Sequence, residues 1–243
     1  MTAQPATEML PLPSVGRTFM AGRTVRLGDV DERGELRLDA IARYLQDVAT
    51  DDAIDAGIVN AMGWLVRRTM IEISRPARLN ERVELTTFCA GAGRSWAERR
   101  TQLRSGDAVC AEAVCLWVQV DPVSGRPQRL DDEFHRHYGP STGGRTVSSR
   151  LSLPKQPAGQ ATGTPWRFRS TDVDPFGHVN NAAQWAVVEH HLDEAGTARV
   201  GVGELEYLAP VDPADALSLD RFGDTGWLRN GPEVRSAWRW RPA

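Results

Sequence analysis

The chain has 243 residues, of which 41% are hydrophobic and 25% are charged, as in an ordinary soluble globular protein. Its 29 Lys and Arg residues against 32 Asp and Glu residues give a formal net charge of −3, which disfavours a protein that binds nucleic acid through phosphates. The opening residues lack the apolar core of a signal peptide, and no apolar run is long enough to span a membrane. We therefore expect a cytoplasmic protein with no membrane insertion.

The first half of the chain predicts a strand, a long helix and an antiparallel meander. Residues 1–17 are polar and contain several prolines, which is typical of a loose leader. A strand is expected over residues 19–27, and the helix after it ends near Gly57 and has an apolar face made by Leu38, Ile41, Leu45 and Val48. Four strand-like runs separated by short turns predict an antiparallel sheet over residues 64–73, 82–89, 95–103 and 108–120.

The second half predicts the same order of elements in shorter form. A strand over residues 166–171 is followed by a helix from about residue 181 to 195, closed by Gly196. Further strands are expected over residues 199–208, 216–222 and 233–241. Trp238 and Trp240 alternate with two arginines in the last of them, which we interpret as an edge strand. A ligand-channel wall or a patch for an acidic partner is the alternative.

These elements predict an α+β protein made of two similar units. The region between the units is poor in large apolar residues and rich in Pro and Gly, which marks a linker. We divide the chain into a leader (1–17), an N-terminal unit (18–131), the linker (132–164) and a C-terminal unit (165–243).

A turn motif occurs once in each unit. Residues 26–38 read RLGDVDERGELRL and residues 169–181 read RSTDVDPFGHVNN, so Arg, Asp, Val, Asp and Gly recur at an offset of 143 (169 minus 26). Such self-similarity indicates a tandem duplication. The second copy carries His178, Asn180 and Asn181 where the first has Glu35, Arg37 and Leu38, so we interpret the second turn as chemical and the first as structural.

Other site chemistries find little support in this turn or elsewhere. Asp172 and Asp174 begin like a calcium loop, but Phe176 and Ala183 stand where the loop needs oxygen ligands. No serine nucleophile elbow, dinucleotide-binding motif or phosphate-binding loop occurs. The three cysteines form no CxxC pair, so we expect reduced, mostly buried thiols and no metal site. Acid–base or carboxylate chemistry remains.

Asp174 and His178 are the candidates for that chemistry. They lie four residues apart across the bend at Gly177, and Asn180 and Asn181 suit the start of the helix that follows. The free N–H groups at a helix start polarise a carbonyl oxygen. A carboxylate beside them can hydrolyse an activated acyl group, as nucleophile or as base for water.

Two aspartates of the turn also suit a structural role. Asp172 and Arg169 recur in the first copy as Asp29 and Arg26, so we assign Asp172, with Gly177, to supporting the turn. Asp174 likewise has a counterpart, which leaves a structural role open for it as well.

The order of motifs resembles the acyl-ACP thioesterases of plants and bacteria, a double hotdog family. The resemblance covers nearly the whole chain: residues 45–49, 64–75, 83–87 and 116–118, the Asp-x-Asp-x-x-x-His-Val-Asn-Asn string at 172–181, and residues 206–207 and 240–241. It implies two units, each an antiparallel sheet around one long helix. It also implies that Asp174 and His178 are catalytic and that an amide near Asn181 contacts the thioester carbonyl. Phe176 and Pro210 depart from the plant pattern, which has Asn and Glu at these positions.

The function that the resemblance implies is acyl-ACP thioesterase activity in fatty acid metabolism, without a cofactor or a metal. The partner is then an acyl carrier protein (ACP) or coenzyme A thioester, and a homodimer is compatible with the sequence. An acyl-CoA thioesterase and a non-hydrolytic acyl-binding hotdog protein stay open as alternatives. We also expect seven arginines to form a basic rim that steers acidic ACP, with a solvated face as the alternative: Arg94, Arg99, Arg100, Arg104, Arg235, Arg239 and Arg241.

Overall fold

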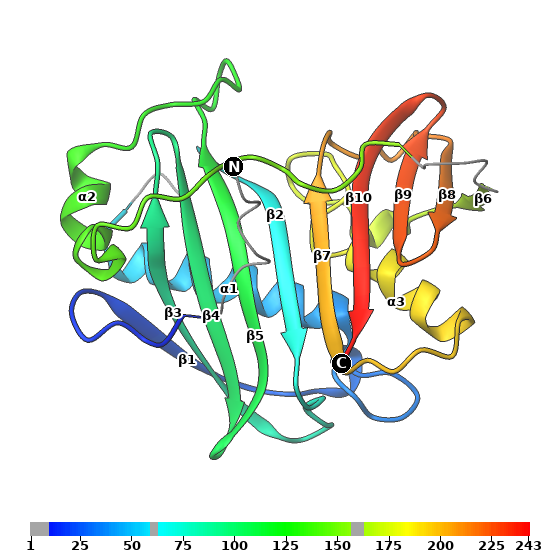
Figure 1. Cartoon of the computed structure of the whole chain (residues 1–243), viewed down its shortest axis with the longest axis horizontal. Coiled ribbons are helices and arrows are strands. Elements are labelled where there is room, and N and C mark those ends of the chain that lie inside the picture. Colours follow the sequence, from blue (N-terminus) through cyan, green and yellow to red (C-terminus); the bar gives the residue numbers. More distant parts are fainter. Residues whose placement is uncertain (1–9, 59–62, 157–162) are drawn as a thin grey trace.

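One ten-stranded sheet, in which all neighbouring strands are antiparallel, organises the protein. The structure is a computed structural model that describes residues 10–58, 63–156 and 163–243. Two helices, α1 (Leu38–Asp55) and α3 (Trp185–Glu194), pack behind the sheet in the view of Figure 1 and contact each other. The predicted leader falls partly outside the described residues.

Each half of the sheet belongs to one half of the chain. The first half contains β1 (Thr18–Thr24), β2 (Trp64–Ile73), β3 (Arg82–Ala92), β4 (Trp96–Ser105) and β5 (Ala108–Gln119). The second half contains β6 (Thr164–Trp166), β7 (Gly201–Tyr207), β8 (Leu217–Phe222), β9 (Thr225–Asn230) and β10 (Glu233–Pro242).

The order of strands from the edge of the sheet to its middle is the same in both halves. Its order is β1-β3-β4-β5-β2-β7-β10-β9-β8-β6, so matching β1 to β5 with β6 to β10 gives the two halves one topology. The halves join through β2 and β7, which pair from Arg68 opposite Glu206 to Ile73 opposite Gly201. The predicted α+β architecture of two helix-and-sheet units is therefore present. The residue boundaries of the units and the linker stay a prediction.

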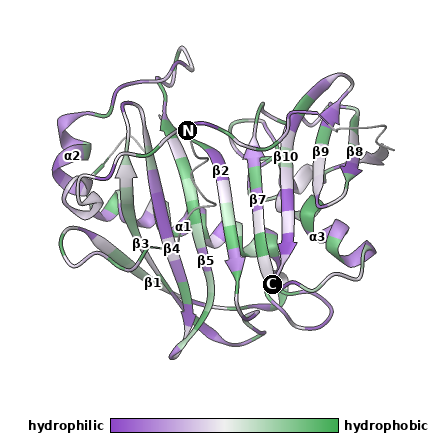
Figure 2. Ribbon diagram, viewed as in Figure 1, coloured by the Kyte–Doolittle hydropathy of each residue, from purple (hydrophilic) through white to green (hydrophobic). Residues whose placement is uncertain are grey.

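The core lies between the sheet and the helices. Alternate strand residues point toward the helices, and Figure 2 shows apolar residues along the central strands β5 and β2. Burying a large apolar side chain stabilises the fold by about 1.5–3 kcal/mol. The fully buried side chains come from both units and include Leu38, Ile71, Leu85, Leu103, Leu116, Trp185, Leu205, Leu219 and Trp238.

The sequence prediction was wrong about the end of the chain. β10 is an interior strand, because it pairs with β7 on one side and β9 on the other. Trp238 and Trp240 are accordingly buried on the core face. β9 was not predicted. Its residue Gly226 has no side chain, and this allows the Trp238 ring to lie against its backbone.

The second helix begins later than predicted. α3 starts at Trp185, whereas residues 181–184 form tighter turns, with the Ala183 N–H donating to Asn180 O (2.9 Å) and the Trp185 N–H to Ala182 O (3.1 Å). The Asn181 carbonyl accepts the Tyr207 hydroxyl (3.2 Å), and the Trp185 N–H donates to Ala182 O instead of to Asn181 O. The helix start predicted at Asn180 and Asn181 is thus a turn before the helix.

Two other segments differ from the prediction. The strand expected over 166–171 overlaps β6 only at Trp166, where β6 ends, and Ser170–Asp172 is a turn of 3₁₀ helix. The expected linker contains a helix, α2 (Asp132–Tyr138), in which Phe134 and Tyr138 are buried against the first unit. Sparse apolar residues in a Pro- and Gly-rich stretch concealed this short helix.

Candidate active site

The two copies of the turn motif fold alike at their first aspartate. In each copy that carboxylate accepts a hydrogen bond from the backbone N–H of the arginine three residues earlier: Asp172 from Arg169 (2.8 Å) and Asp29 from Arg26 (2.9 Å). Each aspartate thereby closes one turn of 3₁₀ helix. The supporting role predicted for Asp172 agrees with these contacts.

The bend that follows is also shared. The Asp174 N–H donates to His178 O (2.9 Å), as the Asp31 N–H donates to Glu35 O (2.9 Å). Gly177 lies between them at a φ of 82°, a left-handed conformation that glycine adopts without strain. The bend therefore places Asp174 and His178 on the two sides of one short loop.

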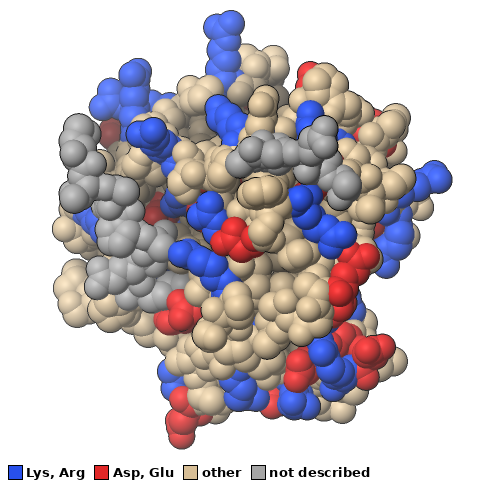
Figure 3. All heavy atoms as spheres, turned by 45° about the vertical axis from the view of Figure 1, so that its right-hand side comes forward, with Lys and Arg blue, Asp and Glu red and all other residues tan. Residues whose placement is uncertain are grey.

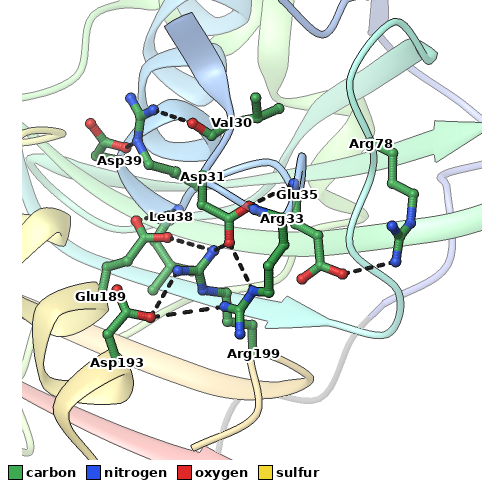
Figure 4. A network of polar contacts seen from close by, with 11 residues as sticks. Val30, Asp31, Arg33, Glu35, Leu38, Asp39, Arg78, Glu189, Asp193 and Arg199 are labelled. Atoms are coloured by element: carbon green, nitrogen blue, oxygen red, sulfur yellow. Dashed lines mark hydrogen bonds and ion pairs between the residues drawn. The ribbon is translucent and has the colours of Figure 1, made fainter. Parts of the chain in front are cut away.

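The second aspartate of the motif is Asp31 in the first copy and Asp174 in the second, and the two side chains have different contacts. Asp31 accepts the Glu35 N–H (2.8 Å) and forms ion pairs with Arg33 and, across to the second unit, with Arg199 (Figure 4). Burial alone would raise the pKa of Asp31, but the Glu35 hydrogen bond and the Arg199 charge lower it. Asp31 is thus fully engaged in holding the two units together.

Asp174 is free of such partners. Within the described ranges its carboxylate makes one hydrogen bond, from the Phe176 N–H (3.0 Å), and no ion pair. His178 is exposed, and in the same ranges no hydrogen bond joins its imidazole to Asp174. The structure brings the two residues to one loop without pairing their side chains.

Asn180 and Asn181 shape the backbone beside this loop. The Asn180 carboxamide accepts the Ala182 N–H (2.8 Å), and the Asn181 carbonyl accepts the Tyr207 hydroxyl, which is itself held by the Trp185 indole N–H (3.2 Å). Burial raises the pKa of Tyr207, so its hydroxyl stays a donor. The Asn181 N–H has no hydrogen-bond partner in the part of the chain that the structure describes.

In the first copy, the backbone N–H that corresponds to the Asn181 N–H has a hydrogen-bond partner. Leu38 stands where Asn181 stands in the second copy (181 minus 143), and its N–H donates to the Glu189 carboxylate of α3 (3.1 Å). Glu189 is buried and ion-paired with Arg199 (3.1 Å). A carboxylate oxygen therefore fills, in the first copy, the place where a carbonyl oxygen could bind in the second.

A small cavity of about 10 Å³ lies next to the second turn. Ala182 and Tyr207 form its wall on the side of the turn, and Gln46 of α1 faces them. By the sequence offset, Gln46 is the counterpart of Glu189 (189 minus 143). The sequence analysis missed Gln46, although extending the offset of the repeat into the helices would have found it. The remaining walls come from Ala42, Leu45, Val66, Thr69, Cys115 and Trp117.

Other groups that could supply chemistry are engaged or unreactive. Glu206, four residues before Pro210, is buried and accepts the N–H groups of Ser152 (2.5 Å) and Leu153 (3.2 Å). All three cysteines are free and buried, and burial raises the pKa of Cys89 and of Cys115 to about 11. Thiols with such pKa values are protonated at neutral pH and poor nucleophiles.

The described residues contain no group of three or more His, Cys, Asp or Glu placed to hold a metal ion. Among the helices in those ranges, none is both long and apolar enough to cross a membrane.

Comparison with known proteins identifies the family. Residues 16–138 match the signature of the acyl-ACP thioesterase N-terminal domain. An uncharacterised protein of Mycobacterium tuberculosis is 31% identical over 209 residues, which cover 85% of this chain and 83% of that protein.

Solved structures share the fold. A putative oleoyl thioesterase from Lactobacillus plantarum aligns with a TM-score of 0.75 at 19% identity, over 96% of this chain and 100% of that one. The 12:0-ACP thioesterase from Umbellularia californica aligns with a TM-score of 0.76 at 20% identity, over 93% and 98%. At these identities the likeness establishes the fold, and the predicted double hotdog is confirmed. Fold and family signature together define a thioester hydrolase with a double hotdog fold. The chain belongs to the acyl-ACP thioesterase family.

Proposed function

We propose that the protein hydrolyses a fatty acyl thioester of acyl carrier protein at the second turn, with acyl-CoA as the alternative substrate. One observation carries this assignment. In the described ranges the Asp174 carboxylate has no ion pair and the Asn181 N–H has no hydrogen-bond partner, and Ala182, the residue after Asn181, lines a cavity. In the first copy, by contrast, Arg199 and Glu189 occupy the counterparts Asp31 and Leu38.

The thioester carbonyl oxygen takes the position that a Glu189 oxygen has in the first copy. There it accepts the Asn181 N–H, and the Gln46 carboxamide, on the facing wall, supplies a second donor. Donors fixed before the reaction stabilise the negative charge that develops on this oxygen in the transition state. Because α3 begins only at Trp185, individual hydrogen bonds carry this role rather than a helix dipole.

Asp174 activates the nucleophile in this scheme. It accepts a proton from water, whose oxygen bonds to the acyl carbon, and the C–S bond breaks as the carrier thiolate leaves and takes up that proton. Direct attack of Asp174 on the acyl carbon, followed by hydrolysis of the anhydride, is the alternative route to the same products. His178 orients the thioester or the water from the other side of the loop. The products are a free fatty acid and the carrier thiol.

The acyl chain enters the protein between α1 and the sheet, at the small cavity beside the turn. Ala42, Leu45 and Val66 give it apolar walls, so burial of the chain contributes binding energy. Such binding energy positions the thioester at the turn.

The carrier is held at the surface, and here the predicted basic rim needs correction. Arg99 forms an ion pair with buried Asp52 (2.5 Å), and Arg100 is itself buried against Glu98 (3.2 Å). Of the seven arginines only Arg94 and Arg241 are exposed. Figure 3 shows basic and acidic side chains mixed over the face it draws rather than one continuous basic surface. Recognition of ACP therefore depends on few charges. Cytoplasmic location and a homodimer remain predictions.

The test is release of free thiol from acyl-ACP and acyl-CoA substrates by the purified protein, with Asp174→Asn as the control. Turnover that the substitution removes supports hydrolysis at this turn. Tight binding of acyl chains by the wild type without any thiol release would favour the non-hydrolytic acyl-binding protein instead.

A further inference from the structure

A second cavity continues the first along α1. It has a volume of about 90 Å³ and extends from the middle of α1 to α2. Trp117 of β5 lines both cavities and is the one residue that their walls have in common. The other residues around the second cavity are Ala49, Thr50, Ala53, Ile58, Trp64, Cys89, Ala97, Arg99, Phe134 and Tyr138.

The same face of α1 covers both cavities. Ala42 and Gln46 line the first, and Ala49 and Ala53 line the second, at the spacing of residues that share one side of a helix. Three of the four are alanines, whose short side chains leave space between the helix and the sheet. The cavities therefore lie one after the other between α1 and the sheet, and Trp117 stands between them.

The sheet around Trp117 is irregular. In β5 it lies opposite Ala97 of β4 and Val66 of β2, and the register of β2 shifts between Val66 and Arg68. Such a bulge changes the direction of neighbouring side chains and is frequent next to active sites. The indole N–H is buried and has no hydrogen-bond partner within the described ranges, so packing alone holds the ring.

We propose that Trp117 limits the length of the acyl chain. The wild type uses the first cavity, beside the turn, and the Trp117 indole blocks the way from there to the second cavity. This inference rests on the proposed function, because it takes the first cavity as the acyl site. Wild-type protein then prefers short acyl chains, whose methyl end stops at the indole. Removing the indole opens the second, mostly apolar cavity to longer chains.

The first test compares wild type and Trp117→Ala on a series of saturated acyl thioesters from short to long. We expect kcat/KM for long chains, relative to short ones, to rise about tenfold or more, since burying about two further methylenes suffices for that factor. Trp117→Leu, which keeps an apolar strand residue, should show a smaller rise in the same direction. An unchanged length profile in both folded variants, or a wild type that already prefers long chains, overturns the proposal.

A filling substitution gives the matched control. Ala53→Phe occupies the second cavity, so it should leave the profile of the wild type unchanged and abolish the gain in the Trp117→Ala background. A gain that survives Ala53→Phe would mean that long chains take another path, against the proposal.

Binding of the corresponding free fatty acids, measured by calorimetry, separates this inference from hydrolysis. A shift of the binding profile toward long acids in Trp117→Ala, in a protein that releases no thiol, would support Trp117 as the wall and overturn the proposed function. Thiol release with no shift in either profile would leave the function standing and refute the wall.

Discussion

Glu189, on α3 of the second unit, accepts a hydrogen bond from the backbone N–H of Leu38, where α1 of the first unit begins, at 3.1 Å (Figure 4). The contact crosses the interface between the units and closes the first copy of the turn motif. In the second copy the corresponding residues are Gln46 and Asn181, and no hydrogen bond joins them in the described parts of the chain. The two copies can therefore be compared directly: the site is closed by the Glu189 hydrogen bond in the first copy and open in the second.

Asp31 and Asp174 hold the same position in the two copies of the turn motif, so substitutions at both can be compared. Asp174→Asn should lower kcat by about 10²–10⁴, the scale of losing a general base, with little change in stability. Asp31→Asn should leave kcat nearly intact but reduce the free energy of unfolding by about 1–3 kcal/mol, because Arg199 loses a buried charged partner. Steady-state kinetics and urea unfolding measure both effects. Equal losses of turnover would mean that both turns are chemical.

His178 gives a second, separate prediction. Since the side chain is exposed, His178→Ala should change the free energy of unfolding by no more than about 0.5 kcal/mol. We expect kcat to fall because the imidazole no longer orients the thioester or the water. Phe176→Ala, at another exposed position of the loop, is the control for simple disturbance of the turn. If both variants lose the same activity, His178 has no specific role.

Gln46 can be tested with two substitutions of similar size. Gln46→Leu removes the second donor and should lower kcat by about 10²–10³, as for loss of one oxyanion donor, while KM changes less. Gln46→Glu should reproduce the closed copy, since a carboxylate there can accept the Asn181 N–H and compete with the thioester oxygen. The mirror substitution, Glu189→Gln, should retain turnover. Full activity in Gln46→Glu would exclude this geometry.

Much of the fold could be predicted because the local signals agree with it. β2 begins and ends where its run of β-branched and apolar residues does, and the apolar face of α1 gave the helix and its packing. The interior place of β10 could not be predicted, since it depends on pairing with β7 and with the unpredicted β9, which are contacts between distant segments.

Only the part of the site that depends on local sequence could be predicted. Asp174 and His178 lie on one loop that a short motif encodes, so the sequence shows them together. Gln46 reaches this loop from the other unit, and Tyr207 redirects the Asn181 carbonyl from β7. Neither contact leaves a local pattern in the sequence, so neither could be predicted.

Carrier recognition should show a weak dependence on charge. We expect kcat/KM for acyl-ACP to fall as salt increases, and to fall several-fold in a variant with Arg94→Glu and Arg241→Glu, because these are the exposed arginines of the predicted rim. Hydrolysis of an acyl-pantetheine, which lacks the acidic carrier, should respond to neither change. If salt and both substitutions leave acyl-ACP hydrolysis unaffected, these arginines do not steer the carrier.

The last prediction concerns the pH dependence of stability and follows from Glu189. Burial raises the pKa of its carboxyl to about 7, and the positive charge of Arg199 lowers it without offsetting the burial. In the unfolded chain the same group titrates near about 4.3. Between these values the folded protein keeps a proton that the unfolded chain has released. Raising the pH through this window therefore reduces the free energy of unfolding, by up to about 1.4 kcal/mol per pH unit.

Glu189→Gln cannot titrate, so the difference in free energy of unfolding between wild type and variant isolates this group. It should decline from about pH 5 to about pH 7 and stay constant at higher pH, as measured by urea unfolding at each pH. Asp193→Asn is the matched control, because Asp193 also pairs with Arg199 (3.0 Å) but is exposed. A flat difference curve for Glu189→Gln would show that Arg199 keeps Glu189 ionised throughout. In that case the closed copy would be held by a full ion pair rather than by a carboxyl that is protonated over part of this range.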